Sequence, residues 1–332
     1  MSENSPNLIT DYVEFRNNQK SIFTAGPASL IPENITELRP CFGRGDNDYI
    51  TLENNVIDSL KRISGHKYIV RLQGSASLAL EIISWNFLYG KILIISTGYY
   101  SDRLKILAEG AKNMQGEISQ IDVIDLNSID NITQNYDWIL CCYTETSRGL
   151  KLPLKRIKKK AEELKSKIML DATASIGLET DHDLADVIGY SSCKGLFGLT
   201  GAAFIAYNSA PNVKVNSFYL NLETHINKGM TGPYHSICSL YKVLPKLDDL
   251  KLSVIENKKK FMNIYSRFIN LPIDKQPLLC TYVNCKIVAK NKKAVLYQPR
   301  GLTKGSVVCH IGEIHLREKA RGEIIDQLKI QS

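Results

Sequence analysis

Short apolar runs alternate with amphipathic segments between about residues 50 and 210. A strand inside a parallel sheet reads as a short continuous apolar run, whereas a helix that covers the sheet repeats its apolar residues every three or four positions. The pattern predicts strands over residues 68–72, 92–97, 138–143, 168–171, 187–192 and 202–207. It predicts covering helices over residues 77–88 and 154–164. This alternation favours an α/β fold with a mostly parallel central sheet.

The pattern changes after about residue 245. A long helix with one polar face is predicted over residues 244–269, followed by strands over 281–289 and 304–314 and a closing helix over 316–330. This order is typical of a small α+β domain. We therefore expect three parts, which are an N-terminal segment at 1–20, a large domain at 21–245 and a small C-terminal domain at 246–332.

Composition and charge narrow the class of protein. The chain has 332 residues, of which 44% are hydrophobic and 23% are charged, and this excludes disordered, collagen-like and disulfide-framework chains. The net charge of +8 suits an anionic ligand as well as it suits nucleic acid. Lysine runs at 158–160 and 258–260 lie on predicted helices without interleaved aromatic residues, so we expect no nucleic-acid partner. No apolar run approaches the length of a membrane span, so we expect no membrane partner either.

The cysteines and histidines show no metal-binding pattern. None of the eight cysteines forms a CxxC pair, and the six histidines do not lie at zinc-ligand spacing beside them. The N-terminus has no apolar run behind a basic start, which a secretory signal would need. We therefore expect reduced thiols, no metal and a cytoplasmic protein.

Lys194 carries the sharpest local signal. It follows the predicted strand 187–192 in the segment SSCKGLFGLTG, and Gly195, Gly198 and Gly201 come after it. A lysine at the carboxyl end of a buried strand lies where doubly wound sheets bind ligands, and a partly desolvated amine there is available for Schiff-base chemistry. A lysine that only caps the turn is the alternative interpretation.

Two other segments place polar or small residues at the end of a predicted strand. Asp171 ends the strand 168–171, where it is either a carboxylate that binds a ligand or the cap of the next helix. After the strand 68–72, residues 74–77 (Gly-Ser-Ala-Ser) open an amphipathic helix, whose free N–H groups can hold a phosphate. The segment lacks the Gly-Lys-Ser/Thr ending of a P-loop.

These segments follow one another as phosphate loop, acidic strand end and lysine strand end. Their order resembles the fold-type I enzymes that use pyridoxal phosphate, specifically the class V aminotransferases near the 2-aminoethylphosphonate–pyruvate and alanine–glyoxylate aminotransferases. The resemblance covers about residues 24–312. It includes SIFTAGPASL for the family's Pro-Gly-Pro loop, TGYYSDR for its Asn-Gly-x-aromatic-x-x-Arg turn, and YTETSRGLKLPL for its Glu-Ser/Thr-Ser/Thr-x-Gly loop.

The resemblance implies a role for each matching residue in a large domain that binds pyridoxal 5'-phosphate. Lys194 would form the Schiff base with the cofactor and move the substrate Cα proton, and Asp171 would pair with the pyridine nitrogen. Tyr100 would stack on the ring, and Thr146 would bond on the side of its phenolic oxygen. The phosphate would be held by Ser75, Ala76 and Ser77, and by Thr231 of a partner subunit.

The resemblance also implies the reaction. A protonated pyridine ring is an electron sink for a carbanion at the substrate Cα, and an adjacent carboxylate keeps the ring nitrogen protonated. The chain would be an aminotransferase that moves an amino group between a small amine or amino acid and a 2-oxo acid by a ping-pong mechanism. Its partners would be these small molecules and a second copy of the chain, because the sites of the implied homodimer are shared between subunits.

Two positions depart from the family pattern. Cys193 replaces a glutamine that often precedes the lysine in the alanine–glyoxylate branch, and His310 replaces the arginine that would grip the substrate carboxylate. A neutral histidine gives no bidentate charged contact. His310 therefore marks either an altered substrate choice or a core histidine. The arginines that could take over the carboxylate are Arg300, Arg103, Arg44 and Arg148, of which we place Arg300 with His310 in the substrate site.

Other functions on this fold stay open at the level of sequence. A lyase or decarboxylase would use the same cofactor but would show no half-transamination. A protein that kept the fold without catalysis would not need both Lys194 and Asp171. A desulfurase would need a cysteine in a late glycine-rich loop, and none is evident.

Overall fold

A seven-stranded sheet forms the centre of the computed structural model, which describes residues 5–38, 45–227, 231–314 and 323–331. Its strands lie in the order β2, β10, β9, β8, β5, β3, β4. Their bounds in that order are Tyr68–Gln73, Ala202–Tyr207, Val187–Ser191, Lys167–Asp171, Trp138–Cys142, Gly90–Ser96 and Ile118–Asp125. The neighbours from β9 to β4 pair in parallel, whereas β10 runs antiparallel to both β2 and β9. The mostly parallel sheet is thus confirmed.

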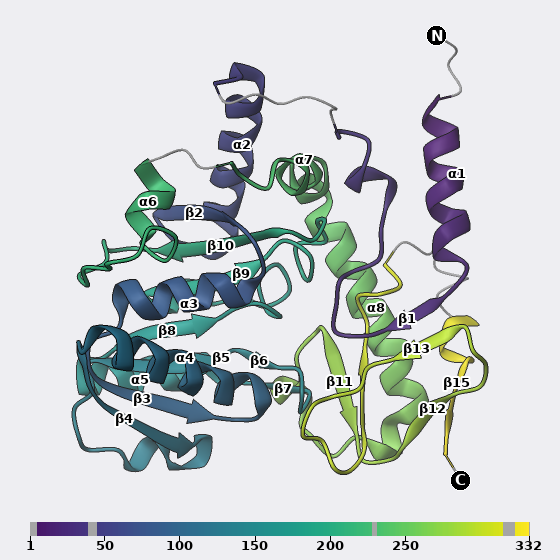
Figure 1. The fold of residues 1–332 in the computed structure, drawn as a ribbon. Coiled ribbons are helices and arrows are strands. Elements are labelled where there is room, and N and C mark those ends of the chain that lie inside the picture. Colours follow the sequence, from purple (N-terminus) through teal and green to yellow (C-terminus); the bar gives the residue numbers. More distant parts are fainter. Residues whose placement is uncertain (1–4, 39–44, 228–230, 315–322, 332) are drawn as a thin grey trace.

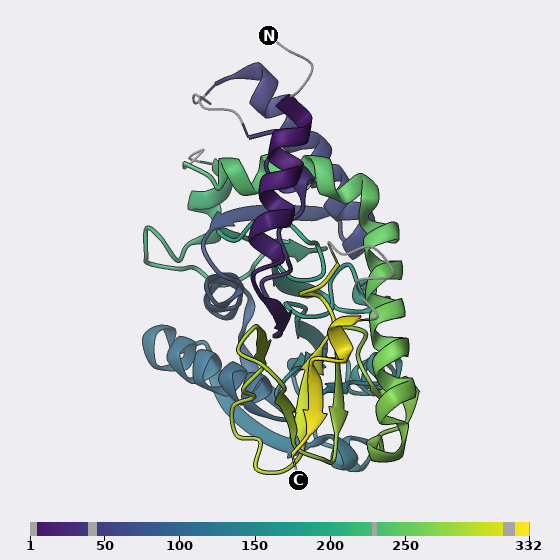
Figure 2. The same cartoon turned by 90° about the vertical axis from the view of Figure 1, so that its right-hand side faces the viewer.

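Helices cover both faces of this sheet (Figures 1 and 2). One face packs on α3 (Ala76–Phe87) and α4 (Tyr99–Gln115), and the other packs on α2 (Asn47–Ser64), α5 (Leu154–Leu164) and α7 (Tyr234–Val243). The strands are apolar on both sides because successive side chains alternate between the two helix layers. In β5, for example, Trp138 and Leu140 join the α3–α4 core while Ile139 and Cys141 join the opposite core.

The C-terminal part of the chain packs against a single long helix, α8 (Leu247–Tyr265). Three two-stranded ladders lie beside it, β11 with β14, β12 with β15, and β1 with β13. The strands are β11 (Cys280–Val283), β12 (Ile287–Ala289), β13 (Ala294–Leu296), β14 (Ser306–Cys309), β15 (Leu328–Ile330) and β1 (Ser21–Phe23). The remaining elements are α1 (Ser5–Asn17), α6 (Leu222–Asn227), β6 (Thr144–Glu145) and β7 (Leu150–Lys151). The first strand of the chain therefore pairs with a strand near its end.

The predicted strands and helices of the central sheet agree with these bounds to within two residues. The C-terminal predictions are less accurate. The predicted strand 281–289 is split into β11 and β12, and the predicted strand 304–314 is short, because only Ser306–Cys309 pairs with β11. The closing helix predicted over 316–330 is wrong at its end, where Leu328–Ile330 pairs with β12, and residues 315–322 lie outside the described part. Among the described residues, no helix is long and apolar enough to cross a membrane.

Candidate active site

A cavity of about 340 Å³ opens at the carboxyl ends of β5, β8 and β9. This is the edge at which parallel sheets with helices on both faces bind ligands. The starts of α3 and α4 and the beginning of β10 complete its wall. The cavity is lined by seven of the eight residues predicted to bind the cofactor, which are Ser75, Ala76, Ser77, Tyr100, Thr146, Asp171 and Lys194.

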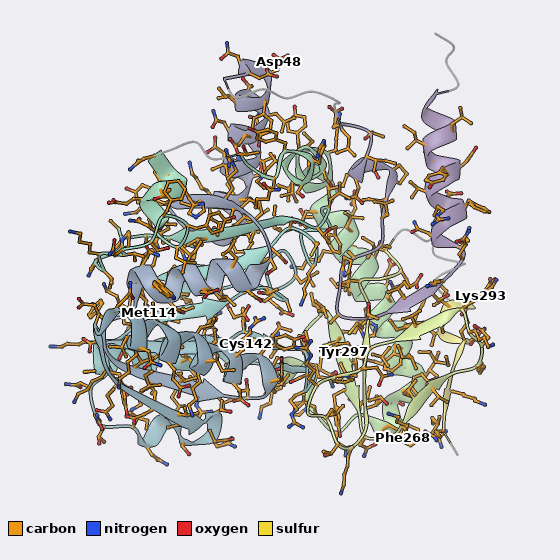
Figure 3. The ribbon with its side chains drawn as sticks, in the orientation of Figure 1. Asp48, Met114, Cys142, Phe268, Lys293 and Tyr297 are labelled. Atoms are coloured by element: carbon orange, nitrogen blue, oxygen red, sulfur yellow. The ribbon has the colours of Figure 1, made fainter. Side chains whose placement is uncertain are left out.

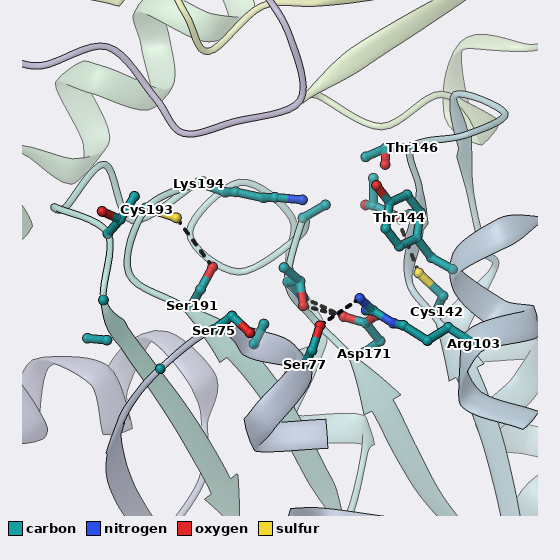
Figure 4. A pocket seen from close by; sticks show the side chains of 18 residues that line it. Ser75, Ser77, Arg103, Cys142, Thr144, Thr146, Asp171, Ser191, Cys193 and Lys194 are labelled. Carbon is teal, nitrogen blue, oxygen red and sulfur yellow. Dashed lines mark hydrogen bonds and ion pairs between the residues drawn. The ribbon is translucent and has the colours of Figure 1, made fainter. Parts of the chain in front are cut away.

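Lys194 lies in a turn whose backbone is packed closely on its neighbours. A Cβ on Gly195 would lie 2.2 Å from the carbonyl oxygen of Ile176, so only glycine fits there. On the other side, Gly26 has a φ of +133°, and a Cβ at that position would lie 3.0 Å from Lys194 Cγ. The side chain is directed across the cavity (Figure 4), and its Nζ lies 5.8 Å from the centroid of the Tyr100 ring. The amine and the aromatic ring thus share one space.

Asp171 ends β8 as a buried carboxylate with partners on both oxygens. Its Oδ1 accepts hydrogen bonds from Thr173 N at 3.0 Å and from Thr173 Oγ1 at 2.5 Å. Its Oδ2 accepts a hydrogen bond from Arg103 at 2.8 Å. The guanidinium of Arg103 also donates to Ser77 Oγ at 3.0 Å (Figure 4). One arginine therefore connects the carboxylate at the end of β8 to the first turn of α3.

The first turn of α3 is free of acidic side chains and of a side-chain cap. Ser75 precedes the first helical residue, Ala76, and its hydroxyl makes no capping hydrogen bond. The helix therefore presents its N–H groups and the positive end of its dipole at the cavity. Such a terminus, with two serine hydroxyls beside it, is suited to hold a phosphate.

Glu145 fixes the start of α4, which carries Tyr100 and Arg103. Its carboxylate is fully buried, and it accepts hydrogen bonds from the backbone N–H groups of Tyr100 at 3.1 Å and Ser101 at 3.0 Å. It also accepts a short hydrogen bond from Ser147 Oγ. Burial raises the pKa of Glu145, and the donated hydrogen bonds oppose this rise. A negative charge at the start of a helix also stabilises the helix dipole.

Hydroxyl groups line the far wall of the cavity. The Oγ1 atoms of Thr144 and Thr146 are buried and have no hydrogen-bond partner among the described residues. Tyr297, from the C-terminal part of the chain (Figure 3), approaches Tyr100 of this cavity. Its Oη lies 3.4 Å from that of Tyr100, and burial raises its pKa. The site therefore receives side chains from the central sheet domain and from the segment after β13.

Three predicted site residues do not line this cavity. His310 is buried, its Nε2 lies 2.9 Å from Thr281 Oγ1, and burial lowers its pKa well below the usual value. Arg300 is exposed, and its guanidinium carbon lies 4.8 Å from the centroid of the Tyr99 ring. Thr231 is exposed as well. The chain by itself brings none of the three to Lys194.

The other arginines considered for the substrate differ in their positions. Arg103 lines the cavity but is engaged by Asp171 and Ser77. Arg148 is exposed and lines a neighbouring cavity of about 410 Å³ with Lys304. Arg44 lies outside the described residues. Cys193 lines the main cavity, with its Sγ 3.8 Å from Ser191 Oγ.

Curated relatives of this chain are aminotransferases. The sequence is 25% identical over 286 residues to a bifunctional phosphonoacetaldehyde hydrolase/aminoethylphosphonate transaminase of Clostridioides difficile, over 77% of this chain and 45% of that protein. It is 26% identical over 255 residues to a 2-aminoethylphosphonate–pyruvate transaminase of Pseudomonas aeruginosa, over 69% of this chain and 68% of that protein. The chain thus spans less than half of the bifunctional relative. No family model matches the sequence.

Solved structures share the fold. A Thermus thermophilus aspartate aminotransferase of subgroup IV superposes with a TM-score of 0.75 over 92% of this chain and 99% of that one, at 18% identity. An alanine–glyoxylate aminotransferase of Nostoc gives a TM-score of 0.74 over 93% of both chains, at 15% identity. The chain is similar in sequence to aminotransferases, and it shares the fold-type I architecture of these solved structures. The predicted fold class is therefore confirmed.

Several contacts of this site were not predicted from the sequence. Glu145 stands in the quoted loop YTETSRGLKLPL, yet nothing local predicts that its carboxylate reaches the start of α4. The ion pair of Arg103 with Asp171 joins residues 68 positions apart. The contact of Tyr297 with Tyr100 joins residues 197 positions apart. One usable signal was present, because Tyr100 and Arg103 are three positions apart and therefore share one face of α4.

Proposed function

We propose that this protein is a pyridoxal-phosphate-dependent aminotransferase that moves an amino group between a small amine or amino acid and a 2-oxo acid. The observation that carries the proposal is the single cavity that brings together Lys194, Asp171, Tyr100 and the first turn of α3. These side chains come from four separate segments of the chain. The names of the transaminase relatives support the same reaction class.

The donors and acceptors of the cavity fit the cofactor. The first turn of α3 supplies N–H groups and hydroxyls for a phosphate, and Asp171 supplies a buried carboxylate for a ring N–H. The buried Oγ1 atoms of Thr144 and Thr146 lack partners among the described residues, and a phenolic oxygen would satisfy one of them. When bound, pyridoxal phosphate supplies the electron sink for a carbanion at the substrate Cα.

The chain's own residues would then have distinct tasks. Lys194 Nζ holds the cofactor covalently and, as a free amine, takes the proton from the substrate Cα and returns it. Asp171 holds the proton on the ring nitrogen, because a carboxylate in a water-poor site favours a positive partner. Tyr100 fixes the plane of the ring by stacking. Ser75, Ala76 and Ser77 hold the phosphate.

The assembly and cell compartment belong to the same proposal. We assign Thr231, which is exposed in this chain, to the phosphate of a neighbouring subunit in a homodimer. The seven cysteines of the described residues are all free thiols, which supports a reducing, cytoplasmic setting. The boundaries 21–245 and 246–332 remain our proposal for the two domains.

Borohydride reduction tests the covalent link. Purified protein loaded with pyridoxal phosphate should carry the reduced label on the peptide that contains Lys194. The peptide that contains Lys258 is an internal control, because Lys258 is a buried lysine outside the cavity and burial lowers its pKa to about 8. Amino donors in a panel of amines should then change the absorbance of the bound cofactor, and a 2-oxo acid should reverse the change. A label on Lys258, or no reversal by any oxo acid, contradicts the proposal.

A further inference from the structure

Arg103 makes contacts that neither the family pattern nor the proposed reaction assigns. Its guanidinium touches three groups of the cavity at once. One terminal nitrogen donates to Asp171 Oδ2 at 2.8 Å, the other donates to Ser77 Oγ at 3.0 Å, and the guanidinium carbon lies 5.2 Å from the centroid of the Tyr100 ring. We assign Asp171 to the ring nitrogen of the cofactor, Ser77 to its phosphate and Tyr100 to the face of its ring.

The environment of Arg103 makes these contacts strong. The Asp171 side chain is only 2% exposed and that of Arg103 is 23% exposed, so solvent screens the ion pair weakly. The Nε of Arg103 is buried without a partner among the described residues. Since both terminal nitrogens are already engaged, the side chain is not a free clamp for a substrate carboxylate.

The shape of the side chain matters as well as its charge. A guanidinium is a planar fork that donates in two fixed directions, whereas a lysine ammonium is a single point donor. Here the two directions lead to different secondary-structure elements, since Asp171 ends β8 and Ser77 lies in the first turn of α3. Arg103 itself lies on α4, whose start is fixed by Glu145. The fork thus sets the positions of three elements around the cavity.

We propose that Arg103 is a positioning residue for the cofactor: it fixes the Asp171 carboxylate and the Ser77 hydroxyl relative to each other, so that both ends of the cofactor are met by oriented groups. This inference rests on the proposed function. It predicts that binding of pyridoxal phosphate depends on the fork geometry of residue 103 and not only on its positive charge.

Titration of cofactor-free protein with pyridoxal phosphate, followed by absorbance, tests this inference. Arg103→Gln and Arg103→Lys should both bind the cofactor about tenfold or more weakly than the unchanged protein. Arg156→Gln is the matched control, because it breaks an ion pair with Asp130, at 2.6 Å, on the exposed side of α5. This control should bind with unchanged affinity.

Rescue separates positioning from general stability. Guanidinium ion at low millimolar concentration should restore cofactor binding to Arg103→Ala, while sodium chloride at the same ionic strength should not. If Arg103→Gln does not fold, a double variant with Arg103→Gln and Asp171→Asn removes both charges of the ion pair. Its affinity for pyridoxal phosphate is compared with that of Asp171→Asn alone. The double variant should bind the cofactor more weakly. Equal affinity in that comparison, or wild-type affinity in Arg103→Gln and Arg103→Lys, overturns the inference. Failure of the unchanged protein to bind pyridoxal phosphate would instead overturn the proposed function.

Discussion

At the scale of single residues, Asp171 has one oxygen bonded to the turn that follows β8 and one bonded to a cation. Its Oδ1 receives the N–H and hydroxyl of Thr173, two positions later. Its Oδ2 receives the guanidinium of Arg103 inside the cavity. The sequence left the cap of a following helix and a ligand-binding carboxylate as alternatives. Residues 173–178 form turns and no helix, so Oδ1 holds this turn while Oδ2 binds Arg103.

Replacing Asp171 by asparagine should separate these two tasks. The amide oxygen keeps the hydrogen bonds from Thr173, but the amide cannot hold a proton on a ring nitrogen. We expect Asp171→Asn to keep the cofactor attached to Lys194 while turnover falls by about 10³-fold, measured by steady-state kinetics. Asp186→Asn is the control, because Asp186 also accepts a backbone N–H, from Ile168 at 2.8 Å, but lies outside the cavity. Equal turnover in the two variants would leave Asp171 only with the role of holding this turn.

His310 yields a prediction about acid stability. Burial lowers its pKa well below the usual value, and the charge of Lys258 lowers it further. In the unfolded chain a histidine titrates near pH 6.5, so below that pH the unfolded state binds the extra proton and the folded state does not. The free energy of unfolding should therefore fall by about 1.4 kcal/mol per pH unit for this group as the pH drops below about 6.

Urea unfolding of the protein and of His310→Gln between pH 5 and 7 measures this slope. The variant should lose less stability on acidification, although His182, whose pKa burial lowers to about 3, keeps part of the slope in both proteins. The turnover of the variant should remain close to that of the unchanged protein, because His310 does not line the cavity. If the pH dependence of stability is unchanged and the substrate choice is altered, His310 contributes to substrate binding and the prediction is wrong.

At the scale of elements, the carboxylate of Glu145 joins the loop after β5 to the start of α4. It meets N–H groups that the helix itself leaves unpaired, and Tyr100 is in that first turn. Glu145→Gln keeps the size of the side chain but replaces one acceptor oxygen by a donor. We expect a loss of about 1–3 kcal/mol in the free energy of unfolding and weaker binding of pyridoxal phosphate.

A matched glutamate distinguishes the two effects. Glu179 is nearly buried and also accepts a backbone N–H, from Leu278 at 2.7 Å, but it does not line the cavity. Glu179→Gln should lower stability and leave the affinity for the cofactor unchanged. If Glu145→Gln also binds the cofactor normally, its carboxylate supports the fold and not the position of Tyr100.

At the scale of the whole molecule, the proposed homodimer shares its sites. Chains with Lys194→Ala lack the amine, and chains with Thr231→Ala lack the hydroxyl assigned to the partner's phosphate. Mixed and reassembled, the two variants should form hybrid dimers in which one of the two sites is intact. Measured turnover should then exceed that of either variant alone and approach about one quarter of the unchanged protein after random mixing. An active monomer, or no recovery in demonstrated hybrids, contradicts a shared site.

The sequence by itself determined six of the seven strands of the central sheet and the segments that meet at its edge. These strands follow from short apolar runs, and the covering helices from their repeated apolar positions. The edge strand β4 was not predicted, because polar residues interrupt its apolar ones. Asp171 ends β8, and Lys194 and residues 75–77 follow β9 and β2 within a few residues. Parallel strands bring these carboxyl ends to one edge. A local pattern plus one topological rule therefore predicts that they gather.

Tertiary structure alone decided the contacts that join distant segments. Three contacts depend on how whole elements pack. They are the ion pair of Arg103 with Asp171, the hydrogen bonds of Glu145 with the start of α4, and the contact of Tyr297 with Tyr100. The same holds for β15, where pairing with β12 replaced the predicted helix, and for His310, which is buried instead of lining the cavity. Periodicity identifies which face of a segment is apolar but not which partner covers it, because that partner is selected by the packing of the complete chain.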